Sequence, residues 1–192
     1  GIHMTSAILT HSNSRFLHLP KTGGSWVIEC LKDNGIDFYA INPERTCRGG
    51  HTGYYYKWKS GFSFSFIRNP FDWYKSLFKF NKDTNKVPHW NKNDINVFVP
   101  QIIRDGYSLH EMSKYYFGNH YEISFIGKYE NLYEDLVDAL DFAIELVDEE
   151  KIRKFSEVFI NTTEQIECDE YTAETKNIIY AVDSYIFRRF KY

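Results

Sequence analysis

The stretch FLHLPKTGGSW, residues Phe16 to Trp26, restricts the fold more than any other part of this 192-residue chain. The apolar run Arg15 to Pro20 has the length of a buried strand, and it ends in a turn that contains two adjacent glycines. A helical pattern from Ser25 to Gly35 follows at once, and its apolar face carries Trp26, Val27, Cys30 and Leu31. A strand, a glycine-containing loop and a helix in this order predict an α/β fold.

The rest of the chain continues the alternation of strands and helices. Further strands are expected at 37–42, 62–68 and in the stretch EISFIGKYENL; helices are expected at 70–80, from 131 onward and at 172–190, with short helices within 81–120. Asn69 is the expected N-cap before Pro70, and Asn131 begins an N-x-x-E capping pattern to Glu134. This alternation predicts a mainly parallel central sheet.

The bulk properties favour one domain in a reducing compartment. Residues 1–4 read as a tag remnant, residues 5–192 as a single domain, and 81–120 as a helical insert on the acceptor side. A net charge of −3 argues against nonspecific binding to nucleic acid or a membrane surface. The three cysteines show no metal-ligand spacing, and neither a run of about 20 apolar residues nor a signal peptide is present. We therefore expect a cytoplasmic protein without a membrane span.

The PKTGGS turn has the chemistry of an anion site. Glycines allow backbone amides to approach an anion, and the helix that follows offers unpaired N–H groups and the positive end of its dipole. Lys21, Thr22 and Ser25 add side-chain donors. The turn is not a Walker motif, because the lysine precedes the glycines. The alternative is an ordinary strand-to-helix turn with a surface lysine.

A second candidate anion site follows the strand at 62–68. Arg68 stands at the end of this strand, and Ser76 falls two turns into the helix, on the side of Trp73 and Phe80. A guanidinium and a hydroxyl suit a phosphate. The alternative is a salt-bridged arginine and a serine that faces solvent.

Taken together, the two motifs resemble a known family. FLHLPKTGGS resembles the 5′-phosphosulfate-binding loop of PAPS-dependent sulfotransferases, and FSFIRNPFDWYKSLF resembles their 3′-phosphate-binding strand and helix. FIGKYENLYEDL and the terminal YTAETKNIIYAVDSYIFRRFKY are similar to later elements of the family, so the resemblance spans Phe16 to Tyr192. The Lys-Thr-Gly-Gly order is closest to the carbohydrate sulfotransferases, heparan sulfate enzymes included. The resemblance implies a P-loop-NTPase-like three-layer sandwich.

The resemblance also implies the site residues and the donor. PAPS (3′-phosphoadenosine 5′-phosphosulfate) would be the sulfuryl donor, without a metal, and the acceptor would be a hydroxyl of a glycan or of a glycosylated small molecule. Lys21 would stabilise charge on the leaving phosphate. The residues expected to contact the nucleotide are Lys21, Thr22, Gly23, Gly24, Ser25, Trp26, Arg68 and Ser76.

The candidate general base is His51, in a Gly-Gly-His stretch similar to that of the heparan-type uronyl enzymes. An imidazole can accept a proton near neutral pH. Glu29 and Glu44 are the alternatives, and His18 is expected to orient the loop or to pack. Residues that could face an acceptor are Tyr54, Tyr55, Tyr56, Trp58, Trp90, Arg104, His110 and Lys114.

Two departures from the family pattern keep other functions open. The glycine-rich R-K-G-x-x-G-D-W-K signature of the cytosolic enzymes is absent, and INTTEQ stands where many relatives carry Asn-Lys-Ser. One alternative is a nucleotide or small-molecule kinase with a variant phosphate loop, although no acidic residue ends a strand where Mg²⁺ would need it. Another is a noncatalytic module that binds PAPS or its product, because a fold does not guarantee activity.

Overall fold

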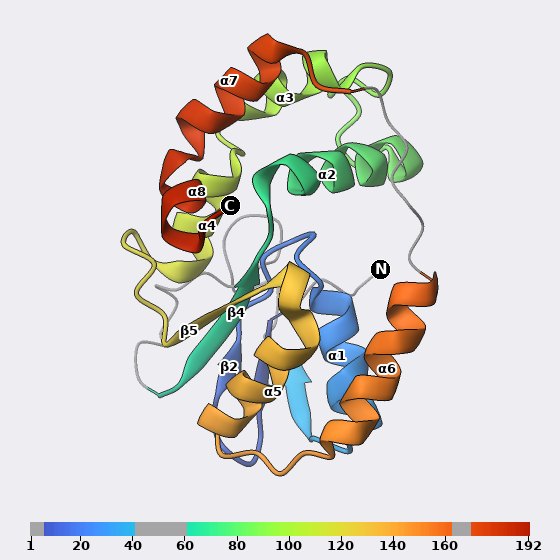
Figure 1. The fold of residues 1–192 in the computed structure, drawn as a ribbon, viewed down its shortest axis with the longest axis vertical. Coiled ribbons are helices and arrows are strands. Elements are labelled where there is room, and N and C mark those ends of the chain that lie inside the picture. Colours follow the sequence, from blue (N-terminus) through green and yellow to red (C-terminus); the bar gives the residue numbers. More distant parts are fainter. Residues whose placement is uncertain (1–5, 41–60, 163–169) are drawn as a thin grey trace. The chain divides into compact units, whose positions relative to one another are not determined.

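The computed structural model describes residues 6–40, 61–162 and 170–192 (Figure 1). The chain divides into two compact units, each built from two separate stretches. Gly1–Ile67 and Ser113–Thr163 form the first, which we call the sheet unit; Arg68–Met112 and Glu164–Tyr192 form the second, the helical unit. The expectation of one domain stays a prediction, as does the role of 81–120 as an acceptor-side insert.

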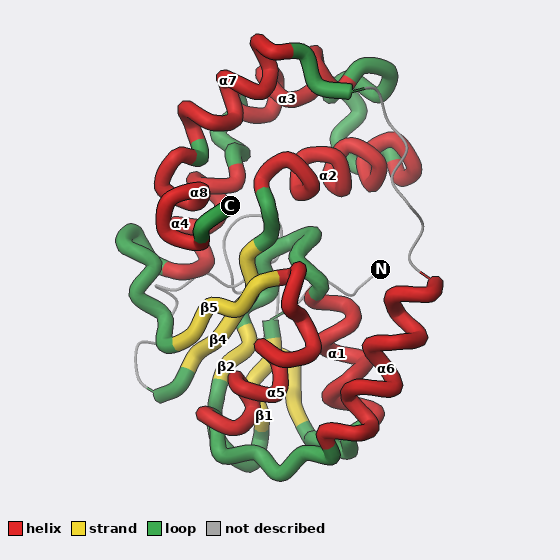
Figure 2. Tube along the Cα trace, viewed as in Figure 1, coloured by secondary structure: helices red, strands yellow, loops and turns green. Residues whose placement is uncertain are grey.

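The sheet unit contains a five-stranded mixed sheet among its described residues (Figure 2). The strands lie in the order β3 (Phe38–Ala40), β1 (Ala7–Leu9), β2 (Arg15–Phe16), β4 (Ser63–Ile67) and β5 (Phe125–Lys128). β2 is parallel to β4 and β4 to β5, whereas β1 is antiparallel to both of its neighbours. Four strands therefore run in one direction and β1 runs against them, so two of the four pairings are antiparallel and the predicted mainly parallel sheet is mixed.

The inserted strand β1 is the main difference from the sequence expectation. A tight turn joins it to β2, with Leu9 N–H donating to Ser14 O at 2.8 Å and Asn13 at φ 57°. This antiparallel hairpin places β1 between β2 and β3, which the pattern of helices and strands alone did not indicate. The α/β class is confirmed, and the sheet is mixed because it contains both parallel and antiparallel pairs of strands.

One face of the sheet packs against helices α1 (Gly24–Asp33), α5 (Leu132–Phe142) and α6 (Glu149–Thr162) (Figure 1). Phe16, Phe64 and Phe66 supply the sheet side of this core, and Trp26 and Leu136 are among the residues from the helices. Burying side chains of this size is the main source of stability in such a unit. The helical face predicted for α1 is thus confirmed.

The entry to α5 differs in detail from the expected capping box. A 3-10 turn, η2 (Tyr129–Asn131), precedes the helix, and Asn131 makes no side-chain capping bond. Asp135 ties this corner instead: one carboxylate oxygen accepts from Lys128 N–H at 2.7 Å and the other from the Asn131 amide at 3.0 Å. The predicted N-cap position at Asn131 is confirmed, but its side chain bonds Asp135 and does not cap the helix.

The helical unit contains α2 (Pro70–Thr84), α3 (Ile95–Arg104), the first residues of α4 (Leu109–Phe117), α7 (Ala173–Val182) and α8 (Ser184–Phe190). The predicted start of α2 is confirmed, since Asn69 Oδ1 accepts from Phe71 N–H at 3.0 Å and Pro70 is the first helical residue. The predicted terminal helix is interrupted at Asp183, which separates α7 from α8.

Candidate functional site

The candidate site of the sheet unit begins where the chain leaves β2. Leu17 N–H still donates to Phe64 O at 2.9 Å, which continues the parallel pairing with β4 beyond the short strand. The chain then turns through Pro20–Gly23 into α1. In parallel sheets the carboxyl ends of the strands are where ligands bind, so the PKTGGS turn, which we call the glycine loop, lies at the expected edge.

The backbone of the glycine loop has two residues in the left-handed region. Lys21 has φ 64° and Gly23 has φ 93°. The Thr22 hydroxyl donates to Leu19 O at 2.8 Å and thereby closes the loop from inside. Lysine in this region is uncommon, and such conformations concentrate at ligand-binding turns.

The absence of a side chain at Gly24 allows a close contact with His18. A Cβ added to Gly24 would lie 1.9 Å from Nε2 of His18, which is buried directly against this residue. His18 is held in turn by Ser6, whose hydroxyl accepts from His18 N–H at 3.0 Å, and by stacking on Phe16. The interpretation that His18 orients the loop therefore has a geometric basis.

Gly23 is fixed from the other side by the corner that follows β5. A Cβ at Gly23 would lie 2.9 Å from Leu132 Cδ2 and 3.3 Å from Tyr129 Cδ2. Sequence reasoning did not select Tyr129 or Leu132, although both follow a predicted strand whose carboxyl end shares an edge with the loop. Together, His18 and the Tyr129–Leu132 corner leave the loop backbone little freedom.

The start of α1 has the properties of an anion-binding terminus. Gly23 is the N-cap and offers no side chain, and the first turn of the helix has no acidic residue. Val27 N–H donates to Gly23 O at 3.0 Å, so the N–H groups of the first three helical residues precede the helical hydrogen-bond ladder. Backbone donors, the positive end of the helix dipole and Lys21 therefore occur in one short segment.

We compared the chain with protein-family models, with curated protein sequences and with solved structures. None of the three comparisons returns a match. The assignment of this site therefore rests on its own chemistry and geometry.

The side chains predicted to contact a nucleotide at this loop have different surroundings. Ser25 is exposed and Lys21 is half-buried. Thr22 and Trp26 are buried, with the Thr22 proton donated within the loop and the Trp26 ring packed on Phe155. Any contact to a ligand from Thr22 or Trp26 is thus expected from the backbone N–H.

The second candidate anion site belongs to the helical unit. Arg68 follows β4 directly and is half-buried, and Ser76 lies on α2. Ser76 is buried, which excludes the alternative of a serine facing solvent. Trp73, from the same side of the helix, is also buried.

The candidate base and most of the predicted acceptor-facing rings lie outside the described residues. These are His51, the alternative base Glu44, Tyr54, Tyr55, Tyr56 and Trp58. The other alternative base, Glu29, is exposed on α1 and forms an ion pair of 3.4 Å with Lys32. All remain predictions.

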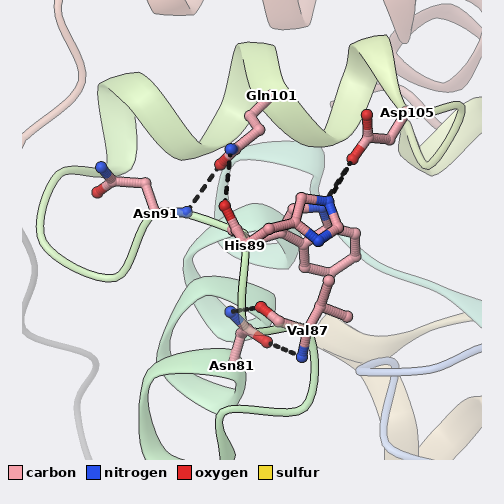
Figure 3. A network of polar contacts seen from close by, with 7 residues as sticks. Asn81, Val87, His89, Asn91, Gln101 and Asp105 are labelled. Atoms are coloured by element: carbon pink, nitrogen blue, oxygen red, sulfur yellow. Dashed lines mark hydrogen bonds and ion pairs between the residues drawn. The ribbon is translucent and has the colours of Figure 1, made fainter.

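The segment between α2 and α3 is held by polar contacts within the helical unit (Figure 3). Asn81 binds both backbone groups of Val87, accepting at 2.8 Å and donating at 3.2 Å. Asp105 Oδ2 accepts from Trp90 Nε1 at 2.9 Å and lies 3.1 Å from His89 Nε2, and these hydrogen bonds lower the pKa of Asp105. Trp90 is buried between Phe98 and Tyr107, which favours a packing role over acceptor stacking.

The other charged residues predicted for the acceptor side have mixed surroundings. Arg104 is exposed, whereas His110 and Lys114 are half-buried. The His110 ring contacts the Tyr185 ring in a tilted arrangement, and the backbone N–H of His110 donates to Asp183 Oδ1 at 2.9 Å. This geometry does not single these side chains out as ligands, so their role stays a prediction.

Asp183 is a buried carboxyl group of the helical unit. Its Oδ2 accepts from the Tyr74 hydroxyl at 2.7 Å, and that hydroxyl in turn accepts from Leu109 N–H at 3.0 Å. Burial raises the pKa of Asp183 to about 7, while the hydrogen bonds from Tyr74 and His110 N–H oppose the rise. Sequence reasoning missed this residue because it lies within a continuous helical pattern.

Cys30 is a buried free cysteine within the described residues. Burial raises the pKa of the Cys30 thiol to about 12, so this cysteine is unreactive. The described part of the chain contains no group of three or more His, Cys, Asp or Glu side chains placed to hold a metal ion. Among the same residues, no helix is both long and apolar enough to cross a membrane.

Proposed function

We propose that this protein is a sulfotransferase that moves a sulfuryl group from PAPS to a hydroxyl group, with a carbohydrate as the acceptor. The observation that carries the proposal is the glycine loop: a left-handed Lys21 and Gly23, and a helix start fixed between His18 and the corner at Tyr129 and Leu132. Its donors are a cation and backbone N–H groups, which suit a phosphosulfate. The finer P-loop-like, three-layer assignment is part of this proposal.

In the proposed reaction, the acceptor oxygen bonds to sulfur as the bond between sulfur and the bridging phosphate oxygen breaks. The transition state is loose and in line, so the protein positions the groups and stabilises charge on the leaving oxygen. Lys21 and the N–H groups at the start of α1 are suited to that task. The acceptor proton passes to a base, for which His51 is the candidate.

The 3′-phosphate of the donor is assigned to Arg68 and Ser76. A forked guanidinium matches the geometry of a phosphate. Ser76 is buried, and a hydroxyl contributes more to binding when it is shielded from solvent. This assignment distinguishes the proposal from a kinase, because ATP has no 3′-phosphate.

The test is calorimetric titration with adenosine 3′,5′-bisphosphate beside AMP, ADP and ATP, at fixed salt and without metal. The proposal requires selective binding of the bisphosphate, followed by transfer from PAPS in a screen of hydroxyl acceptors. A preference for ATP would favour the kinase. Tight bisphosphate binding with no turnover over a broad panel, unaffected by His51→Ala, would favour the noncatalytic module.

Two substitutions separate the roles of the loop and the arginine. Arg68→Ala should weaken bisphosphate binding by about 1.5 to 3 kcal/mol, the usual contribution of a charged hydrogen bond, and leave AMP binding unchanged. Lys21→Ala should lower turnover far more than stability. Equal loss of AMP and bisphosphate binding in Arg68→Ala would contradict the 3′-phosphate assignment.

A further inference from the structure

The loop between α5 and α6 exposes three large apolar side chains. Phe142, Ile144 and Leu146 are 63%, 80% and 93% exposed, and they alternate along five residues. The Phe142 ring packs on Phe62 and Phe125, with ring centroids 6.2 and 5.8 Å apart. The apolar surface is therefore continuous with the start of β4 and β5, at the opposite end of the sheet from the glycine loop. We call these three residues the apolar knob.

The backbone of the apolar knob is held in a strained conformation. Ile144 has φ 59°, in the left-handed region that β-branched residues avoid. Ile144 N–H donates to Asp141 O and Glu145 N–H to Leu140 O, each at 3.0 Å, which is the Schellman pattern that normally has glycine at this position. Isoleucine here costs stability and contributes little burial, so folding alone does not account for it.

The knob is also fixed at both ends. Glu145 Oε1 accepts from Ser12 N–H in the β1–β2 turn at 3.2 Å, and Asp148 N–H donates to Asn34 Oδ1 at the end of α1 at 3.2 Å. Asp148 Oδ1 then accepts from the N–H groups of Glu150 and Lys151 at the start of α6. Because the loop is anchored, its apolar side chains are presented to solvent in a defined arrangement, and binding requires little ordering.

Acidic residues predominate in the chain around the knob. The stretch 138–150, which includes the knob, contains six acidic residues and no lysine or arginine, and Lys151 follows it, although the whole chain has a net charge of only −3. These acidic residues are Asp138, Asp141, Glu145, Asp148, Glu149 and Glu150. An apolar centre with an acidic rim is complementary to a polypeptide that combines apolar side chains with lysine or arginine.

We propose that the apolar knob and its acidic rim form a docking surface for a basic, amphipathic segment of a partner protein. A second copy of this chain would bring two acidic rims together, and an anionic membrane would repel them. Both are therefore disfavoured by charge. This surface is independent of the glycine loop, and its test does not depend on the sulfotransferase proposal.

The test uses the full chain and a synthetic amphipathic helical peptide of leucine and lysine as the probe. We expect binding that weakens with salt, and at least tenfold weaker binding for Leu146→Ser, because truncation of a central apolar contact commonly costs about one decade or more in affinity. Ile144→Gly should also weaken binding while it raises the unfolding midpoint, so a loss of fold cannot explain the effect. Val97→Ser, which removes an exposed apolar side chain of α3, is the matched control and should bind as the wild type.

Four further measurements complete the test. A leucine and glutamate peptide should not bind, and a serine and lysine peptide should bind much more weakly than the leucine and lysine peptide. Equal binding of the two lysine peptides, or of the wild type and Leu146→Ser, would overturn the proposal, since charge alone would then explain it. Knob-dependent binding to phosphatidylglycerol vesicles, or knob-dependent dimerisation in sedimentation, would replace the partner protein with a membrane or a second copy.

Discussion

At the scale of single residues, the two glycines of the glycine loop are required for different reasons. Gly23 adopts φ 93°, which few other residues tolerate, whereas Gly24 leaves space for the His18 ring. Neither requirement depends on a ligand. The loop is therefore built before any anion arrives, which is the condition for a site that does not have to reorganise during a reaction.

Gly24→Ala should displace His18 or the start of α1. Its Cβ would lie 1.9 Å from His18 Nε2, and overpacking of a buried site costs about 1 to 3 kcal/mol of unfolding free energy. Urea unfolding measures this cost. The double variant His18→Ala/Gly24→Ala should show a smaller loss than the sum of the two single variants, since the clash is then removed. Simple additivity would mean that the two residues do not interact.

Ile144→Gly should stabilise the protein. The left-handed conformation costs a residue with a Cβ about 1 to 2 kcal/mol, and part of this gain is offset by the greater freedom of glycine in the unfolded chain. We expect a net increase of about 0.5 to 1 kcal/mol in the free energy of unfolding, measured in urea. Ile144→Ala is the control: it removes most of the side chain but keeps the strain, so it should give little or no increase.

At the scale of elements, residue patterns predicted the helices better than the strands. The faces of α1 and α2 and the Asn69 cap follow from periodicity and capping chemistry. The three-residue strand β1 is too short for an alternation to be recognised, and its place between β2 and β3 depends on pairing between distant residues. The break at Asp183 was missed for a similar reason, because its partners Tyr74 and His110 are remote in sequence.

The candidate site could be predicted in part for the same physical reason. The glycine loop is a local feature, so its residues could be selected from the chain alone. The supports at His18, Tyr129 and Leu132 depend on three-dimensional packing, and of these residues only His18 adjoins the loop in the sequence. Residues that act through packing leave little trace in a single sequence.

Asp183, which lies between α7 and α8 and bonds Tyr74 of α2 and His110 of α4, should make the free energy of unfolding depend on pH. Burial raises the pKa of Asp183 to about 7, above the value of an unfolded aspartate, so the folded state binds this proton more tightly. The stabilising contribution is complete below about pH 4, and it is lost as the pH rises towards about 7. Carboxyl groups whose pKa is lowered on folding change the free energy of unfolding in the opposite direction. The test therefore compares the wild type with a variant that lacks the Asp183 carboxyl group.

Asp183→Asn supplies that comparison. Asparagine keeps the shape and an acceptor for His110 N–H but cannot titrate. The free energy of unfolding of the wild type, relative to this variant, should fall by an amount on the order of 1 to 3 kcal/mol between pH 5 and pH 8, measured by urea unfolding at each pH. A constant difference over this range would show that Asp183 does not take up a proton on folding.

At the scale of the whole molecule, the chain path interleaves the two units. Each unit combines an early and a late stretch of sequence, and the single helix α4 contributes residues to both. No single cut of the chain separates one complete unit from the other. This organisation argues that the units fold together, although each has its own compact set of contacts.

We therefore expect one cooperative unfolding transition, as for a single domain. In scanning calorimetry, the calorimetric enthalpy should equal the van't Hoff enthalpy, which is the criterion for two-state behaviour. Adenosine 3′,5′-bisphosphate at about a hundred times its dissociation constant should stabilise the folded state by about 2.7 kcal/mol and move the whole transition upward. Two separate transitions, with only one shifted by the bisphosphate, would show instead that the units unfold independently and that the nucleotide contacts belong to one of them.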